Sequence, residues 1–277
     1  MMKKIDSHQH FWRYEAEQYP WINDSMPDLK QDRLPQHLQP LLQQFNFDGS
    51  IVVQARQSLS ENQFLLTLAK SNPWILGIIG WLNLCDKDIE EQIIELKSHN
   101  IIKGYRHLIQ DEANPDNFMK LKAFNHGVDV VLNQGLVYEV LIHDVNLTAA
   151  TQFCAKHDQG ILVLDHVGKP NISQSTPKEW EKKIRPLANL THVACKLSGL
   201  ITEVGANWTA AQIEPFIDIA LNTFGPNRLL FGSDWPVCLL AGEYSQVYQL
   251  IEKNINHLSP SEQAAIWGNN ASRVYNL

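Results

Sequence analysis

The sequence has few of the features that mark secreted, cysteine-rich metal-binding or membrane-spanning proteins. Its 277 residues include four cysteines and no CxxC pair, so we expect reduced thiols rather than a disulfide framework or a cysteine zinc site. The longest apolar run, Trp74–Leu82, is too short to cross a bilayer, which takes about 20 residues. The opening MMKKIDSHQH does not contain the apolar stretch of a signal peptide. These absences favour a cytoplasmic protein that does not enter a membrane.

An excess of basic residues is also missing. Lys and Arg number 23 against 30 Asp and Glu, and the net charge of −7 argues against nucleic acid or an anionic membrane as partner. With 44% hydrophobic and 19% charged residues, the composition is that of a globular protein with an ample core. The length fits two domains or one large α/β domain, since barrels of that class reach about 250 residues.

Apolar runs of strand length recur along the whole chain and predict eight β-strands. Their starts lie roughly 25 to 43 residues apart, which leaves room for one strand, one helix and two loops. The predicted strands are Lys4–Phe11, Phe47–Ala55, Ile75–Asn83, Ile102–Ile109, Leu136–His143, Ile161–Val167, His192–Ser198 and Arg228–Trp235.

Helical patterns fill most of the gaps between these runs. In Asp86–His99, Asp86 is placed as the N-cap and an apolar stripe follows at helical spacing. The other predicted helices are Glu61–Ser71, Phe124–Asn133, Val145–His157, Pro177–Leu187, Ala210–Phe224, Glu243–Asn254 and Pro260–Asn270. Alternating apolar strands and helices indicate a parallel sheet covered on both faces, so we expect one (β/α)₈ TIM-type barrel domain over residues 1–277. A doubly wound sheet is the alternative, but its usual Gly-rich turn after the first strand is absent.

One segment interrupts this alternation. Arg13–Gln44 follows the first predicted strand and is rich in proline and aromatic residues. It is too long for a simple connector, and long irregular loops in compact domains are often functional lids. A lid over a site and a packed surface loop both remain open as interpretations.

The first predicted strand contains the sequence IDSHQHFW, residues 5–12. Residues two apart in a strand point to the same side, so Asp6, His8 and His10 are expected on one face. An acid and two imidazoles directed to one point have little use in a structural strand. The motif therefore predicts a functional site.

Polar residues also follow most of the other predicted strands. These are Arg106 and His107, then Tyr138, Glu139 and His143, then Asp165, His166 and Lys169, then Lys196 and Ser198, and finally Ser233 and Asp234. A single histidine at a strand end is more often structural, and an aspartate before a proline-bounded turn is usually turn chemistry. The gathering of so many at the carboxyl ends, where such barrels build active sites, favours function.

The ordered motifs resemble the amidohydrolase superfamily of metal-assisted hydrolases. They are the paired histidines on the first strand, LDHVGKP around His166, KLSGL with Lys196 and Ser198, FGSDWPV around Asp234, and the terminal WGNNASRVYNL. The resemblance runs from residue 5 to residue 277. It is strongest to the branch that holds pyrone-dicarboxylate lactonase and L-fuconolactone and L-rhamnonolactone hydrolases.

The resemblance implies a metal site with a departure from the two-metal pattern. Binuclear members have a bridging, N-carboxylated lysine at the end of the fourth strand, where this chain reads IKGYRHLI and Lys103 lies too early. At most one ion is therefore expected. Its ligands would be His8, His10, His166 and Asp234, a set that suits zinc. His143 is a less favoured extra ligand, and lactonases of this branch can also work without metal.

The main hypothesis is a lactonase that opens a small hydroxylated lactone. The resemblance implies that Asp234 is the general base for water, and that His8, His10 and His166 polarise the carbonyl. The substrate-binding residues would be Arg106, Tyr138 and Lys169, while Asp6 and Asp165 would only support neighbouring groups.

Three alternatives stay open. The first is a zinc-dependent decarboxylase on the same scaffold, and the second is an inactive barrel used as a binding module. The third is a pyrone-dicarboxylate lactonase. A doubly anionic pyrone favours several arginines, whereas the candidates include only Arg106 with Lys169 and Lys196. This favours neutral aldonolactones, and neither the sugar nor the oligomeric state is predicted.

Overall fold

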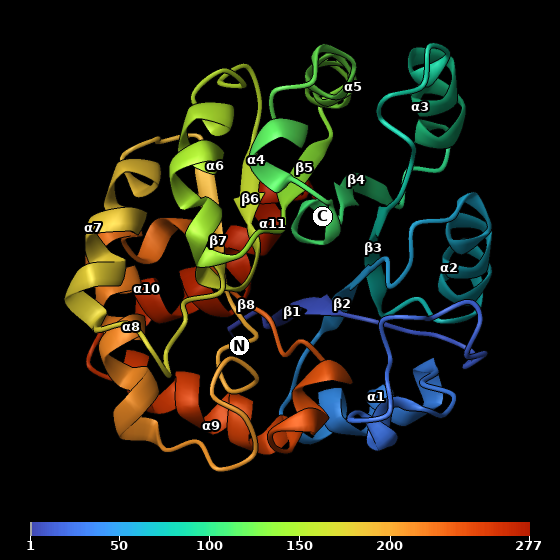
Figure 1. Ribbon diagram of the computed structural model, residues 1–277. Helices are drawn as coiled ribbons and strands as arrows, with labels where there is room; N and C mark the ends of the chain where they lie inside the picture. The colour runs from blue at the N-terminus through green and yellow to red at the C-terminus, as the bar shows by residue number, and fades with distance from the viewer. Residues whose placement is uncertain (1) are drawn as a thin grey trace.

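Eight parallel strands form a nearly closed barrel in the computed structural model, which describes residues 2–277 (Figure 1). The strands are β1 (Ile5–Gln9), β2 (Gly49–Val53), β3 (Ile75–Gly80), β4 (Ile102–His107), β5 (Val137–Val140), β6 (Leu162–Leu164), β7 (Val193–Leu197) and β8 (Leu229–Phe231). Each strand pairs with the next along the chain, in the order β1 to β8. The backbone after β8 returns to β1, because the His10 amide donates to the Trp235 carbonyl at 2.7 Å. The predicted (β/α)₈ barrel is confirmed.

Helices surround the strands (Figure 1). They are α1 (Pro35–Gln44), α2 (Leu59–Ser71), α3 (Ile89–Lys97), α4 (Pro115–Phe118), α5 (Lys122–Asn133), α6 (Leu147–Cys154), α7 (Pro177–Ala188), α8 (Ala210–Phe224), α9 (Tyr244–Ile255), α10 (Pro260–Ala264) and α11 (Asn270–Val274). Helix α8 has the predicted bounds, whereas α3 starts later because Asp88 rather than Asp86 is its N-cap. Among residues 2–277, no helix combines the length and apolarity that crossing a membrane requires.

The last predicted helix, Pro260–Asn270, is more complex than its sequence pattern indicates. It comprises α10, a π-helix at Ala265–Asn269 and the start of α11. Gly268 in the π-helix lies so close to the chain before β1 that a Cβ atom there would be 2.3 Å from the Lys3 carbonyl oxygen. The missing side chain therefore lets the C-terminal helices pack directly against the start of the barrel.

The strands separate two apolar layers. Outward side chains such as Val52 and Leu162 pack under the helices, while inward side chains such as Ile51 and Val163 fill one end of the barrel. We call the latter group the interior cluster; it consists of Ile5, Ile51, Val53, Ile79, Val137, Val163, Ala194, Leu230, Ala271, Val274 and Tyr275. The C-terminal helix α11 thus closes the apolar end of the barrel.

The segment after β1 is more ordered than a long irregular loop. Its last part forms helix α1, and Pro27–Leu29 forms a 3₁₀ turn, which corrects the expectation of a loop over the whole of Arg13–Gln44. Trp12, Tyr19 and Leu29 pack together in a separate small cluster. The segment therefore has its own apolar anchor beside the carboxyl end of the barrel.

Candidate active site

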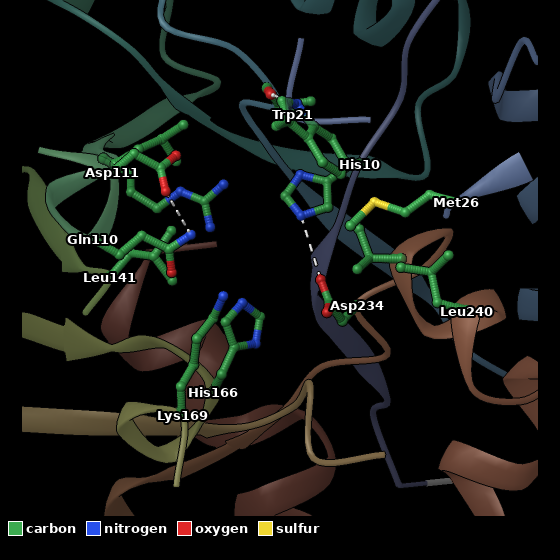
Figure 2. A pocket seen from close by; sticks show the side chains of 14 residues that line it. His10, Trp21, Met26, Gln110, Asp111, Leu141, His166, Lys169, Asp234 and Leu240 are labelled. Atoms are coloured by element: carbon green, nitrogen blue, oxygen red, sulfur yellow. Dashed lines mark hydrogen bonds and ion pairs between the residues drawn. The ribbon is translucent and has the colours of Figure 1, made fainter. Parts of the chain in front are cut away.

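A cavity of about 260 Å³ opens at the carboxyl ends of the strands (Figure 2). Five predicted site residues line it, namely His10, Arg106, His166, Lys169 and Asp234. They follow β1, β4, β6 and β8, and they meet because the carboxyl ends of parallel strands share one rim of the barrel. The structure thus brings together residues that are up to 224 positions apart in the chain.

Three candidates do not line this cavity, and one of them, His8, is fully buried next to His10. Tyr138 is fully buried on the outer face of β5, where its ring packs edge-on against Phe124 and Phe153. Its neighbour Glu139 faces the interior, because successive strand residues point to opposite faces. This corrects the expectation that Tyr138 binds substrate. His143 is exposed and does not line the cavity.

The pairing of β1 with β2 shifts register between Asp6 and Gln9. The strict alternation of faces expected for the motif on β1 is therefore interrupted there. Asp6 does not share a face with the histidines; it accepts hydrogen bonds from the Ser233 amide at 2.9 Å and the Tyr244 hydroxyl at 3.2 Å. Asp6 therefore ties β1 to the turn after β8 and to α9. This is the supporting role that the sequence predicts for it.

The centre of the site consists of His8, His10 and Asp234. The Nε2 atoms of the two histidines are 3.2 Å apart, and Asp234 Oδ1 lies 3.4 Å from His10 Nε2 and 3.7 Å from His8 Nε2. His10 Nδ1 lies 2.8 Å from the Val53 carbonyl oxygen, which can only accept, so Nδ1 carries a proton. Backbone pairing fixes the group, since the Asp234 amide donates to the His8 carbonyl at 2.8 Å.

His166 and Lys169 are displayed by an unusual turn after β6. The φ angles of His166, Val167 and Lys169 are 52°, 54° and 47°, and that of Gly168 is 70°. A left-handed conformation is a genuine outlier for a β-branched valine, and such backbone strain concentrates at functional sites. Asp234 has a φ of 57° as well. The strain therefore lies on the segments that deliver the polar side chains of the cavity.

A glycine after β7 leaves room for the His166 ring. His166 Nδ1 lies 2.9 Å from the Ser198 hydroxyl oxygen. A Cβ at Gly199 would stand 2.6 Å from the same Nδ1, and Gly199 also has a φ of 68°. Gly199 in the KLSGL motif therefore leaves the space in which the His166 ring is held.

Burial sets the charge of these groups. It lowers the pKa of His166 to about 4, and together with the Lys196 charge it lowers that of His8 well below 6.5. Burial alone would raise the pKa of Asp234, but His166, His10 and His8 outweigh it and hold that pKa below its ordinary 3.8. At neutral pH the site thus holds an ionised Asp234 beside neutral His8 and His166.

A layer of buried charges lies beneath the histidines. Asp165 Oδ2 accepts a 2.9 Å ion-pair hydrogen bond from Arg106, whose other nitrogen donates to the Gln54 carbonyl at 2.7 Å. Lys196 lies 3.1 Å from Asp165 Oδ1 and 2.6 Å from Glu139. Arg106 thus faces the cavity and also belongs to this layer. The sequence placed Lys196 and Glu139 at strand ends but assigned no role to either.

The remaining cavity wall has two different sides. The polar residues besides the core of the site are Gln110, Asp111 and Lys169, and the apolar ones are Trp21, Met26, Ala55, Leu108, Leu141, Val237 and Leu240. Figure 2 shows Met26 and Leu240 on the opposite side of Asp234 from Gln110 and Asp111, which lie beside Leu141. Proline and aromatic residues around Met26 signalled a lid in the sequence. Gln110, Asp111 and Leu240 carried no pattern that would have revealed them.

The donor set fits a zinc ion. Within the described residues, the ligand atoms of His8, His10 and Asp234 all lie within 4.8 Å of one another. Two nitrogens 3.2 Å apart match a tetrahedral ion with bonds of about 2.0–2.1 Å. His166 does not join this group but forms a second one with His8 and Asp165. The four ligands predicted from the sequence are therefore divided between two overlapping triads.

Comparison with known proteins agrees with this site. The amidohydrolase family profile matches residues 5–277. An L-fucono-1,5-lactonase from Burkholderia multivorans is 42% identical over 287 aligned residues, which cover 99% of this chain and 96% of that protein. An L-fucono-1,5-lactonase from Burkholderia ambifaria is 30% identical over 281 residues, which cover 100% of this chain and 97% of that protein.

A solved structure gives the same relationship in three dimensions. An amidohydrolase from Burkholderia multivorans with bound zinc superposes with a TM-score of 0.96 at 43% identity, over 99% of each chain. Fold, site and sequence therefore agree. The chain belongs to the amidohydrolase family, in the branch that includes the L-fucono-1,5-lactonases.

Proposed function

We infer that the protein is an enzyme that opens a small sugar lactone by attack of water on the ring ester carbonyl. The observation that carries this inference is the position of Asp234, whose Oδ1 lies 3.4 Å from His10 Nε2 and which lines one cavity with His10 and His166. The similarity to L-fucono-1,5-lactonases over the full chain gives the reaction class. Net charge −7 and four free cysteines fit a cytoplasmic enzyme with a neutral substrate and no nucleic-acid partner.

Asp234 is the proposed general base. It accepts a proton from water as the water oxygen bonds to the carbonyl carbon, and it returns that proton to the ring oxygen as the ester C–O bond breaks. The product is an open-chain hydroxy acid. A carboxylate with a lowered pKa is a weak base, so its position beside the nucleophilic water has to contribute as much as its basicity.

The histidines stabilise the carbonyl oxygen as it gains negative charge. The Ser198 hydroxyl can donate to His166 Nδ1, which leaves the proton of the neutral ring on Nε2 as a donor. Arg106 and Lys169 line the cavity and orient substrate oxygens, Arg106 with a planar group already held by Asp165. Because Ser198 holds His166 and Asp165 holds Arg106, these donors need not rearrange as negative charge develops on the substrate.

His8, His10 and Asp234 would hold the metal ion, at most one per chain. Zinc bound there supplies a Lewis acid for the carbonyl and lowers the pKa of water. We propose that the reaction does not depend on it, so a chelated enzyme keeps substantial activity. Elemental analysis that finds two tightly held ions, or complete inactivation by chelator with rescue by zinc, would contradict this proposal.

The apolar side of the cavity suggests which sugar is bound. Met26, Val237 and Leu240 can receive a methyl group, while Gln110 and Asp111 face the ring hydroxyls from the other side. We therefore propose a 6-deoxy aldonolactone of the L-fucono type. A hydroxyl added at C6 would be desolvated against apolar carbon, which typically lowers kcat/KM by about 10–100-fold.

The test is a pH-indicator assay on a panel of sugar lactones, with and without chelator. The highest kcat/KM is expected for L-fucono-1,5-lactone, and L-galactono-1,5-lactone, which adds only the C6 hydroxyl, serves as its matched comparison. Equal rates for the two would remove the methyl-site assignment. Absence of hydrolysis across the whole panel would remove the lactonase assignment.

A further inference from the structure

The backbone that ends β2 and leads into α2 holds three side chains of the cavity. Three successive carbonyl oxygens of this segment each lie within hydrogen-bond distance of a nitrogen on one of these side chains. The contacts are His10 Nδ1 to Val53 at 2.8 Å, Arg106 Nη2 to Gln54 at 2.7 Å and Trp21 Nε1 to Ala55 at 2.9 Å. All three side chains line the cavity. A shift of residues 53–55 would therefore displace all three together.

Glu61, in the first turn of α2, holds this segment from outside the cavity. The residue is fully buried, and both of its carboxylate oxygens accept a hydrogen bond. Oε1 accepts from the Ala55 amide at 2.9 Å, and Oε2 accepts from Arg56 Nε at 2.8 Å. The Ala55 peptide is thus held by Glu61 through its amide, while its carbonyl accepts from the Trp21 indole.

Arg56 extends this contact to the segment after β1. Its guanidinium lies 5.3 Å from the centre of the Tyr19 ring. Tyr19 belongs to the small apolar cluster of that segment, against which Trp21 and Met26 pack. Since Trp21 and Met26 both line the cavity, the pair of Glu61 and Arg56 links the end of β2 to the wall above the site.

Stability alone does not explain a carboxylate at this place. A buried ion pair adds little net stability, because both charges lose their hydration. We propose that Glu61 is a positioning residue that fixes residues 53–56 and, through their carbonyl groups, orients the three cavity side chains. That this orientation serves the opening of a lactone rests on the proposed function. Misplacement of reacting groups by about 1 Å can lower a rate by about 100-fold, so such a contact matters without touching the substrate.

Asn62, the next residue of α2, provides a matched control. It is buried as well, and it holds the backbone after the neighbouring strand β3 in the same way. Asn62 Oδ1 accepts from the Trp81 amide at 2.9 Å, and Nδ2 donates to the Trp81 carbonyl at 2.7 Å. Trp81 does not line the cavity. Loss of either side chain should lower the free energy of unfolding, but only loss of Glu61 should alter the site.

The first experiment compares Glu61→Ala with Asn62→Ala by urea unfolding and by kinetics on folded protein. In Glu61→Ala, kcat/KM for the best lactone should fall by ~10–100-fold, with a loss in kcat. Asn62→Ala should keep wild-type kcat and kcat/KM. If Glu61→Ala does not fold, Glu61→Asp takes its place, because it keeps the charge but is one methylene too short to reach both partners. A role in stability alone would leave kcat of the folded Glu61 variant unchanged, and that result, or an equal loss of kcat in Asn62→Ala, would overturn the proposal.

The second experiment does not depend on activity. Protein labelled with ¹⁵N-tryptophan gives one indole N–H signal for each tryptophan, and the Trp21 signal is identified by its loss in Trp21→Phe. Hydrogen exchange at this indole should be slow in the wild type and in Asn62→Ala, and faster in the Glu61 variant. Fast exchange in the wild type, or unchanged exchange in the Glu61 variant, would overturn the proposal. A wild-type protein that hydrolyses no lactone would refute the proposed function, but it would leave the exchange result as the test of Glu61.

Discussion

The two ends of the barrel interior contrast sharply. At one end the interior cluster is wholly apolar apart from the Tyr275 hydroxyl, and it is closed by α11. Toward the other end the inward residues are Arg106, Glu139 and Lys196, all at most 3% exposed. Charges buried in this way add little stability beyond the cost of their desolvation. The contrast indicates that the apolar end stabilises the fold and that the charged end is retained for the site above it.

The largest expected effect is a loss of activity at the charged end. Asp234→Asn keeps the shape of the side chain, and asparagine tolerates the left-handed φ of 57° at this position. Removal of a general base typically costs ~10²–10⁴-fold in kcat, while the melting temperature should change little. Steady-state kinetics and thermal unfolding test both. A variant that kept more than about a tenth of wild-type kcat would remove Asp234 from the base role.

Arg106→Met should damage both stability and activity. An exposed rim pair would contribute only about 0–1 kcal/mol, but Arg106 is buried against Asp165, and removing one member of a buried pair typically costs about 3–5 kcal/mol. Lys169→Met is the matched control, because Lys169 lines the same cavity but has no ion pair among residues 2–277. It should lower kcat/KM by ~10-fold, about 1.4 kcal/mol, at a nearly unchanged melting temperature.

Thermal unfolding together with steady-state kinetics separates the two variants. Equal melting temperatures for Arg106→Met and wild type would mean that the buried pair has no structural role. Wild-type kcat/KM in both variants would mean that neither side chain holds substrate.

The apolar end should show the opposite pattern. Ile51→Ala removes a fully buried side chain of the interior cluster and should lower the free energy of unfolding by about 2–5 kcal/mol. The kcat of the folded variant should stay near that of wild type, since Ile51 does not line the cavity. Urea unfolding and kinetics below the transition provide the measurement. A large loss of kcat in folded protein would show that the two ends are coupled.

A smaller effect is expected from the pH dependence of stability. The pKa of His166 is about 4 in the folded protein and ordinarily 6.5, so the unfolded chain binds the proton first as pH falls. The stabilisation from neutral His166 is complete above pH 6.5 and is lost between pH 6.5 and 4, by up to about 3 kcal/mol. Glu139, with a pKa raised to about 7 mainly by burial, acts in the opposite direction as pH falls from 7.

The wild-type curve therefore has to be compared with His166→Asn. As pH falls from 7 to 4.5, the free energy of unfolding should fall less, or rise more, in the variant than in the wild type, because the loss from His166 is missing. Identical pH dependence of the two proteins would mean that His166 is not held neutral by burial.

Sequence pattern predicted the barrel because its strands and helices are local features. Apolar runs and helical stripes depend on neighbouring residues, so all eight strands overlap their predicted positions and α8 matches its bounds. Five of seven predicted site residues line the cavity, because strand ends of a parallel barrel share one rim. The wrong predictions concern which of two neighbouring strand residues faces the barrel interior. Tyr138 and Glu139 are neighbours on β5, and only the barrel geometry decides which of them faces inward.

The sequence by itself determined the order of elements, the absence of a binuclear lysine position and the histidines and Asp234 as a candidate site. Only the tertiary structure decided how these groups pair: that Asp6 turns toward α9, that His166 forms a triad separate from His10, and that Lys196 lies beside His8. The physical reason is distance along the chain. Lys196 and His8 are 188 residues apart, and no local preference encodes a 3.0 Å contact that exists only when the barrel closes.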